Sequence, residues 1–244
     1  MNASAIELDS VTVAFGGLRA LDGVSVAIES KRITGLIGPN GSGKSTLVNA
    51  ISGQIPATAG NVRVDGRDVT RMRSDRIVQL GLARTFQIPR FPPQLTVEEI
   101  VAVPLIYGRG ADHFLPGLRT AADVAAFCGL GARRFTTCQN LTVTEMRRLE
   151  IARALACGPS VLLLDEVMAG LSHSDSVEVI ELVRKINRAA VTVVIIEHLM
   201  RVITALCDDL IVLNNGKLLR HGSPKAVLAD AAVREAYLGK GFAA

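Results

Sequence analysis

Residues 38–46 of the chain read Gly38-Pro39-Asn40-Gly41-Ser42-Gly43-Lys44-Ser45-Thr46. They fit the pattern G-x-x-x-x-G-K-[ST] and lie between the apolar run Ile33 to Ile37 and the apolar-periodic run Leu47 to Ile51. Glycines let such a loop curl until successive backbone N–H groups face phosphate oxygens, and the N-terminus of the following helix adds partial positive charge. Lys44 is then expected to reach the β- and γ-phosphates, and Ser45 to ligate Mg²⁺. The flanking runs favour this strand, loop and helix over a chance glycine-rich turn.

A second candidate for chemistry is the pair of carboxylates Asp165 and Glu166, which ends the apolar run Val161 to Leu164. Two acids at the end of a buried strand are costly unless a cation or a reaction needs them. We expect Asp165 to hold Mg²⁺ and Glu166 to accept the proton of an attacking water. An ordinary exit from strand to turn is the alternative.

Three single residues are further candidates, each with a structural alternative. His198 follows the apolar run Val191 to Ile196 and could sense a γ-phosphate or serve a structural role. Gln87 stands where strand patterns give way to helical ones, and could touch Mg²⁺ or the water, or be an ordinary surface glutamine. Phe15, ahead of Gly16-Gly17, could stack on adenine or pack in the core.

Short apolar runs separated by helical periodicity indicate a parallel sheet covered on both faces. These runs are Ile33 to Ile37, Val161 to Asp165, Val191 to Glu197 and Leu210 to Leu213. Alternating patterns predict a small antiparallel β-layer near the start of the chain, over Ile6 to Val13, Val24 to Ile28 and Asn61 to Val64. Between about Pro89 and Cys157 we expect a helical insertion. Its helix-compatible runs are Val97 to Val103, Ala121 to Phe127 and Glu145 to Ala156.

Composition limits the class of protein. The 244 residues, about half of them apolar and a fifth charged, suffice for one α/β domain. The net charge of +4 is spread along the chain, which argues against nucleic-acid binding. No apolar run approaches the roughly 18 residues of a membrane span, and Met1 to Ser10 lack the features of a secretory signal, so we expect a cytosolic location. The four cysteines form no C-x-x-C pair, which argues against zinc and disulfides.

The order of phosphate loop, Gln87, helical insertion, Asp165-Glu166 and His198 resembles that of the nucleotide-binding domains of ABC transporters, over nearly the whole chain. Several phrases are similar to those of ATPase subunits of branched-chain (hydrophobic) amino acid uptake systems. They are Phe15 to Leu21, Arg84 to Gln87, Arg147 to Leu155, Ala169 to Leu171 and Ala236 to Gly239. Related importers of urea and short amides share many of these sequence motifs.

The resemblance implies one ABC transporter nucleotide-binding domain over residues 1–244, with a P-loop NTPase fold and a RecA-like parallel sheet. Residues 1–87 and 158–244 would form the α/β ATPase core with an N-terminal antiparallel β-subdomain, and residues 88–157 the inserted α-helical subdomain. The implied activity is binding and hydrolysis of ATP, with Mg²⁺, to drive transmembrane uptake of branched-chain or other hydrophobic amino acids.

The resemblance also assigns residues and partners. The implied catalytic residues are Glu166, His198 and Lys44, and the implied metal ligands are Ser45, Gln87 and Asp165. The implied nucleotide contacts are Phe15, Gly38, Pro39, Asn40, Gly41, Ser42, Gly43, Lys44, Ser45, Thr46, Gln87 and Thr142. We expect a peripheral protein on the cytoplasmic face of the inner membrane. Its partners would be membrane permease subunits, a second ATPase subunit and, indirectly, an extracytoplasmic substrate-binding protein, but no nucleic acid.

Two stretches depart from that family's pattern. The signature loop, approximately Leu-Ser-Gly-Gly-Gln in the family, is Leu141-Thr142-Val143-Thr144-Glu145 in this chain. Thr142 keeps a hydroxyl that can cap a helix, but Thr144 replaces a glycine whose bare backbone approaches the nucleotide. Glu145 adds an anion near a polyphosphate, which is unfavourable unless its side chain turns away. After Glu166, the usual proline is Val167 and the usual Asn-Pro is Ser172-His173.

The altered signature bears on the expected dimer. Each nucleotide site of such a dimer joins one subunit's phosphate loop, Asp-Glu pair and His to the other subunit's signature helix. A homodimer would carry the altered signature in both sites, whereas a heterodimer would keep one competent site, so we predict a heterodimer. A nucleotide-gated regulatory subunit with weak hydrolysis is the alternative.

Two other classes of protein fit the residues less well. An ABC-type ATPase of DNA repair or translation generally carries a long coiled-coil insertion or tandem domains, and neither pattern occurs in this sequence. A P-loop kinase or GTPase would leave the placement of Glu166 and His198 unexplained, and the guanine-reading Asn-Lys-x-Asp does not occur.

Overall fold

The computed structural model describes residues 3–87, 89–109, 115 and 117–238. It divides the chain into two compact units, a first unit of residues 1–77 with 194–244 and a second unit of residues 78–193. The chain passes between them in helix α2 (Ser74–Leu80) and in strand β8 (Thr192–Ile196). Within the described ranges, no helix is both long and apolar enough to cross a membrane. The subdomain limits expected at residues 88 and 157 stay a prediction.

The first unit contains the predicted antiparallel layer. Its strands pair in the order β2-β1-β4-β5, with bounds β1 (Ser4–Phe15), β2 (Leu18–Glu29), β4 (Ala59–Val64) and β5 (Arg67–Asp68). Strands β1 and β2 form a hairpin in which Phe15 faces Leu18. Gly16, at φ 58°, makes the tight turn between them, at a backbone angle that other residues rarely adopt. The alternating sequence pattern therefore corresponds to a real antiparallel sheet.

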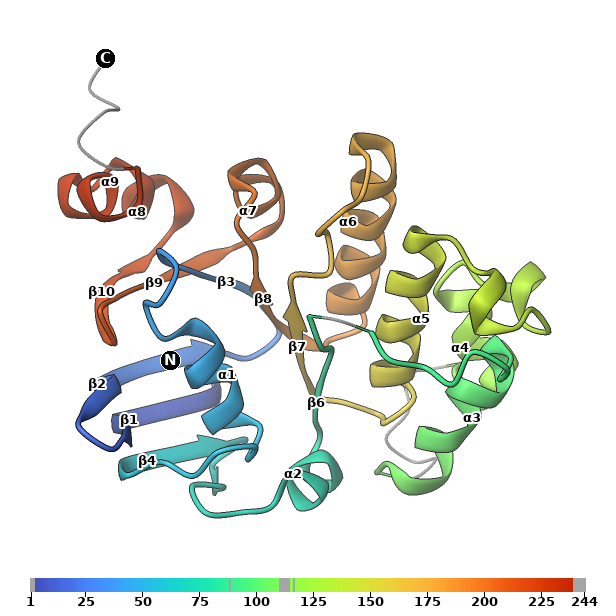
Figure 1. Ribbon diagram of the computed structural model, residues 1–244, viewed down its shortest axis with the longest axis horizontal. Coiled ribbons are helices and arrows are strands. Elements are labelled where there is room, and N and C mark those ends of the chain that lie inside the picture. The colour runs from blue at the N-terminus through green and yellow to red at the C-terminus, as the bar shows by residue number, and fades with distance from the viewer. Residues whose placement is uncertain (1–2, 88, 110–114, 116, 239–244) are drawn as a thin grey trace. The chain divides into compact units, whose positions relative to one another are not determined.

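A second sheet of the first unit carries the phosphate-loop strand. Its neighbouring strands are β10 (Lys217–Gly222), β9 (Asp209–Asn214) and β3 (Ile33–Ile37), with the end of β8 beside β3. Strands β3 and β9 are parallel, and all five residues of β3 are buried, as expected of a strand covered on both faces. Helices α8 (Pro224–Ala229) and α9 (Ala231–Leu238) lie beside β9 and β10 (Figure 1).

A compact apolar cluster holds these helices to the sheet. It joins buried residues of α7 (Met200–Leu206), α8 and α9 to buried residues of β3 and β9. The members are Ile37, Ile203, Leu210, Val212, Val227 and Val233. Burying a side chain of this size contributes about 1.5–3 kcal/mol, so this cluster is a main source of stability for the strand that leads into the phosphate loop.

The second unit begins with the parallel strands β6 (Leu82–Arg84) and β7 (Val161–Asp165), and β7 neighbours the start of β8. Its helices are α3 (Val97–Tyr107), α4 (Ala121–Phe127), α5 (Val143–Leu155) and α6 (His173–Arg188), with short 3₁₀ turns at Gly131–Arg133 and Cys138–Asn140. Helices α3, α4 and α5 contact one another. Each of these three starts at a threonine in a capping box, at Thr96, Thr120 and Thr142. The helical insertion is therefore present, and α5 starts two residues earlier than predicted because Thr142 caps it.

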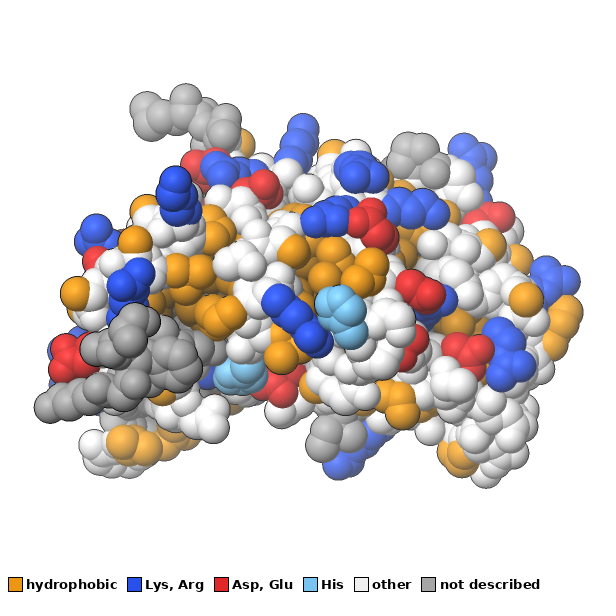
Figure 2. Space-filling view, turned by 90° about the horizontal axis from the view of Figure 1, so that it is seen from above, with side chains coloured by type: hydrophobic (Ala, Val, Ile, Leu, Met, Phe, Trp, Pro, Cys, Tyr) orange, Lys and Arg blue, Asp and Glu red, His pale blue; other side chains and the backbone are white. Residues whose placement is uncertain are grey.

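Charged side chains are mixed on the surface. On the face shown in Figure 2, Lys and Arg side chains are interspersed with acidic, apolar and other polar groups. Several form exposed ion pairs, such as Arg32 with Glu29 at 2.8 Å. Exposed pairs of this kind contribute about 0–1 kcal/mol each, so apolar burial dominates the stability of the fold.

All four cysteines are free thiols, with Cys128 and Cys138 buried and Cys157 and Cys207 half-buried. Burial raises the pKa of Cys128 to about 12, and that of Cys207 to about 12 as well. A thiol that stays protonated at neutral pH is a poor nucleophile and a poor metal ligand. These residues behave as small apolar side chains of the core.

Candidate functional site

The phosphate loop, residues 38–46, connects β3 to helix α1 (Lys44–Ile51). Two of its glycines are required by close packing. A Cβ atom at Gly38 would lie 2.2 Å from the Leu213 carbonyl oxygen, and one at Gly43 would lie 2.7 Å from the Ala20 carbonyl oxygen. Both also have positive φ, at 153° and 104°. The loop is thus pressed against the backbone of its neighbours, which only glycine permits.

The polar groups of the loop fit a phosphate chain. Lys44 is 7% exposed, and its Nζ donates to the carbonyl oxygens of Gly38 at 2.8 Å and Pro39 at 2.9 Å. Ser42 is 1% exposed, and its hydroxyl oxygen has no hydrogen-bond partner among the described residues. A buried hydroxyl without a partner is unfavourable, and an anion in the loop would satisfy it. A helix start, an ammonium and an unsatisfied hydroxyl together make a site for phosphate oxygens.

Phe15 and His198 also belong to the first unit. Phe15 lies at the tip of the β1–β2 hairpin and is 54% exposed, which excludes the alternative that it packs in the core. The same hairpin supplies Ala20 and Leu21, which Gly43 approaches closely, so the ring is on an element that borders the loop. His198 is exposed and follows the buried end of β8. Adenine stacking by Phe15 and phosphate sensing by His198 stay predictions.

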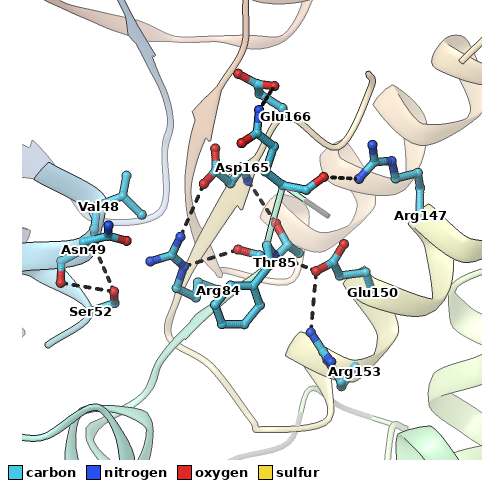
Figure 3. Close-up of polar contacts among 12 residues, drawn as sticks. Val48, Asn49, Ser52, Arg84, Thr85, Arg147, Glu150, Arg153, Asp165 and Glu166 are labelled. Carbon is cyan, nitrogen blue, oxygen red and sulfur yellow. Dashed lines mark hydrogen bonds and ion pairs between the residues drawn. The ribbon is translucent and has the colours of Figure 1, made fainter. Parts of the chain in front are cut away.

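In the second unit, Asp165 is the last residue of β7 and is 7% exposed. Its backbone N–H donates to the Thr85 hydroxyl at 2.9 Å, and Arg84 lies 3.3 Å from its carboxylate, as Figure 3 shows. Burial lowers the pKa of Arg84, and the charges of Asp165 and Glu150 oppose that effect. The Asp165 carboxylate is thus held in a buried ion pair, and its role as a Mg²⁺ ligand stays a prediction. Sequence reasoning gave Arg84 no role, since a partner 81 residues away leaves no local pattern.

Glu166 follows Asp165 in a left-handed backbone conformation, with φ 50°. A residue other than glycine in this region costs about 1–3 kcal/mol and is common at functional sites. The Gln87 side chain donates from Nε2 to Glu166 Oε2 at 2.7 Å. Gln87 is therefore not an isolated surface residue, and the structure brings together two of the predicted site residues that are 79 positions apart.

The altered signature segment forms the start of α5. Thr142 Oγ1 accepts from the Glu145 N–H at 3.2 Å, while Glu145 accepts from the Thr142 N–H at 2.8 Å. Arg133 Nε lies 2.9 Å from the other oxygen of Glu145. Burial opposes ionisation of Glu145, but these hydrogen bonds and Arg133 lower its pKa below the usual value. The Glu145 side chain is thus turned back onto its own helix, and its negative charge is paired with Arg133.

The second departure from the family pattern lies at the start of helix α6. The Ser172 hydroxyl caps α6 and donates to the Asp175 carboxylate at 2.6 Å, which holds the pKa of Asp175 below its usual range. Further along the two helices, Arg148 of α5 pairs with Glu178 of α6. The helices that begin at the two altered segments are therefore joined by an ion pair.

Each group of site residues follows the carboxyl end of a buried strand, where α/β sheets bind ligands. The phosphate loop follows β3, Asp165 is the last residue of β7 with Glu166 directly after it, and His198 follows β8. The first unit offers an anion-binding loop with an ammonium group. The second unit offers the buried Asp165 carboxylate, which is suited to a hard cation, and the half-buried Glu166 carboxylate held by the Gln87 amide, which is suited to activating water.

Comparisons with known proteins find relatives over nearly the full chain. The model of the ABC transporter family matches residues 21–169, and that of the branched-chain amino acid ATP-binding cassette transporter matches residues 221–243. Over 98% of its length, the chain is 32% identical to the whole of the high-affinity branched-chain amino acid transport ATP-binding protein BraF of Pseudomonas aeruginosa. It is also 32% identical, over 96% of its length and 95% of the relative, to the probable branched-chain amino acid transport ATP-binding protein LivG of Archaeoglobus fulgidus.

Solved structures give the same result for the fold. An ATP-binding cassette of an ABC transporter in its ADP conformation has a TM-score of 0.86 to this chain, with 29% identity, covering 97% of this chain and 99% of that one. A nucleotide-free ATP-binding cassette has a TM-score of 0.87, also with 29% identity, covering 97% of this chain and all of that one. The α/β fold expected from the sequence, with its antiparallel layer and helical insertion, is confirmed.

Proposed function

Because this chain belongs to the ABC transporter family, as an ATP-binding cassette ATPase, we propose that its ATP hydrolysis drives uptake of branched-chain or other hydrophobic amino acids. The observation that carries this proposal is the similarity over the full chain to ATP-binding proteins of branched-chain amino acid transport, joined by the family match at residues 221–243. The relatives described above lend no support to the urea and short-amide alternative.

In the proposed site, the first unit binds the nucleotide. The Phe15 ring stacks on adenine, and the N–H groups of residues 38–46 with Ser42 and Lys44 bind the phosphates. The unsatisfied Ser42 hydroxyl and the glycine positions that admit no side chain support this assignment. Mg²⁺, when bound, would neutralise phosphate charge, and Ser45, Asp165 and Gln87 are the residues that would hold it.

Hydrolysis is assigned to Glu166 and His198. Glu166 accepts the proton of the attacking water at its carboxylate, while Gln87 fixes the orientation of that carboxylate through the 2.7 Å hydrogen bond. His198 contacts the γ-phosphate and helps to orient the water. Lys44 stabilises charge that develops on the phosphate oxygens. Thr142, at the start of α5, contributes to the site of the opposite subunit.

Uptake by the reconstituted transporter tests the substrate class. In vesicles that hold the permease subunits and ATP, we expect accumulation of labelled leucine in the presence of the binding protein. Lys44→Ala should lower this uptake by on the order of 100-fold, because the ammonium no longer stabilises the transferred phosphate. ATP-dependent accumulation of urea without leucine would support the short-amide alternative instead.

ABC importer ATPase subunits work with membrane permease components, and for this chain we propose that the companion ATPase is a different protein. Thr144 stands where the family has a glycine whose bare backbone approaches the nucleotide, so its β-branched side chain would fill that space. A homodimer would repeat this arrangement in both sites. The chain would act at the cytoplasmic face of the membrane, with the extracytoplasmic binding protein delivering substrate on the other side.

ATPase assays of the chain alone and with its companion test the heterodimer. We expect the companion to raise the turnover rate by at least about 10-fold, since one site then receives an unaltered signature helix. Brisk hydrolysis by the purified chain alone would contradict the heterodimer. Single-turnover hydrolysis in the assembled complex separates this motor from a regulatory subunit, which would bind ATP and leave it intact.

A further inference from the structure

Helix α5 carries two side chains that bind the backbone of Phe86 and Gln87, shortly after strand β6. Glu150 and Arg147 are three residues apart and so lie on the same side of the helix. Glu150 Oε1 accepts from the Phe86 N–H at 2.6 Å, and Arg147 Nη1 donates to the Gln87 carbonyl oxygen at 2.9 Å. One acceptor and one donor of α5 thus satisfy the first N–H and the last carbonyl group of this dipeptide.

Glu150 and Arg147 bind the backbone directly after the point where strand pairing ends. Strand β6 stops at Arg84, and the Thr85 N–H still donates to the Leu163 carbonyl oxygen of β7 at 2.9 Å. The Phe86 N–H and the Gln87 carbonyl oxygen then have their partners on α5 rather than on a strand. In Figure 3, Glu150 lies between Thr85 and Arg153, and Arg147 points toward the same segment. Helix α5 therefore holds the Gln87 backbone through its carbonyl oxygen.

Burial of the Glu150 carboxylate at this place is energetically unfavourable. It is 0% exposed, and its second oxygen has no hydrogen-bond partner among the described residues. Burial raises its pKa, and the Phe86 N–H and Arg153 only partly offset that effect. Replacing such a buried charge with an apolar side chain of similar volume is often neutral or stabilising, so a contribution to stability is a weak reason for its presence.

The contacts of this segment extend to the Glu166 carboxylate, directly after β7. Gln87 holds Glu166 through its side-chain amide at 2.7 Å, and Arg147 Nη2 also donates to the Ala169 carbonyl oxygen at 3.3 Å, in the loop after Glu166. A displacement of α5 would therefore move both the amide that orients Glu166 and the loop that follows it. The contacts form one continuous path from the signature helix to the candidate base.

We propose that Glu150 and Arg147 are positioning residues, which hold Gln87 against Glu166 from the signature helix of the same subunit. The inference rests on the proposed roles of Gln87 and Glu166. It makes the orientation of the candidate base depend on α5, the same helix that begins with the altered signature segment. Neither side chain touches the nucleotide in this mechanism.

Substitution of Glu150 in the assembled transporter tests the proposal. Glu150→Met removes the acceptor for the Phe86 N–H, and we expect kcat for ATP hydrolysis to fall about 10- to 100-fold, because a small misplacement of a catalytic group has this effect. KM for ATP should change by less than about threefold, since the phosphate loop is untouched. Glu150→Gln keeps an oxygen that accepts from Phe86 and should restore most of kcat, which loss of a merely apolar contact would not predict.

The matched control is Glu181→Met on α6, an exposed glutamate, which should keep the parental kcat. Parental kcat in Glu150→Met, or no recovery in Glu150→Gln, would overturn the proposal. If Glu150→Met does not assemble, Arg147→Met tests the proposal instead, and we expect the same fall in kcat with little change in KM. Its control is Arg188→Met, at an exposed position of α6. Parental kcat in Arg147→Met would then overturn it.

Glu166→Gln, measured in parallel, separates this inference from the proposed function. A fully active Glu166→Gln contradicts Glu166 as the base and leaves the proposed site in error. An inactive Glu166→Gln beside fully active Glu150→Met and Arg147→Met contradicts only the positioning role.

Discussion

Glu166→Gln should lower the rate constant of ATP hydrolysis by about 10²- to 10⁴-fold, the range expected for loss of a general base. The substitute is isosteric, and its amide oxygen can still accept from Gln87, so the geometry of the site is retained. Affinity for ATP should be unchanged, because the carboxylate acts on the attacking water rather than on the bound ground state. Rapid-quench single-turnover measurements give the rate constant, and equilibrium binding of a fluorescent ATP analogue gives the affinity.

Glu181→Gln is the matched control for that change. It removes the same charge from an exposed position of α6 and should hydrolyse ATP at the parental rate. Hydrolysis by Glu166→Gln at a rate close to that of this control would remove Glu166 from the mechanism. Loss of ATP binding in Glu166→Gln would instead mean that the carboxylate belongs to the binding site.

Gly38→Ala should abolish high-affinity ATP binding. The added Cβ atom would lie 2.2 Å from the Leu213 carbonyl oxygen, which is backbone and cannot swing aside, and the φ of 153° is itself unfavourable for alanine. The loop must shift, and phosphate then loses N–H contacts. Losing two charge-assisted hydrogen bonds at about 1.5–3 kcal/mol each weakens binding by on the order of 100-fold or more. Titration calorimetry with ATP and Mg²⁺ measures this directly.

Gly17→Ala provides the matched control. A Cβ atom at Gly17 meets no atom within 4 Å, and this residue does not have a positive φ. Its affinity for ATP should equal that of the parent. If Gly38→Ala bound ATP as tightly as Gly17→Ala, the loop would not approach the nucleotide through its backbone as proposed.

Part of the candidate site could be predicted from local sequence patterns. The strand, loop and helix at residues 33–51 could be predicted because glycine spacing, Lys44 and the flanking apolar runs lie within a single short segment. The carboxylates at the end of β7 could be predicted because an apolar run ending in two acids is conspicuous. The partner of Asp165 could not, because Arg84 pairs with it only after β6 and β7 align side by side.

The signature segment shows the opposite case. Its departure from the family pattern was visible in the sequence, but its consequence was not. The sequence left open whether Glu145 would face phosphate, and the capping box with Thr142 and the ion pair with Arg133 settle that it turns back. Likewise, an ion pair between Arg148 and Glu178, which are 30 residues apart, joins the helices that begin at the two altered segments.

The sequence by itself determined the family, the fold class, the phosphate loop and the identity of the two carboxylates, because each depends on spacing within a short stretch. Tertiary structure alone decided which distant groups meet: Gln87 with Glu166, Arg84 with Asp165, and Glu150 with Phe86. The physical reason is that each of these contacts requires a strand or helix to bring together backbone from separate parts of the chain. No periodicity in the sequence records which of several possible partners the final packing selects.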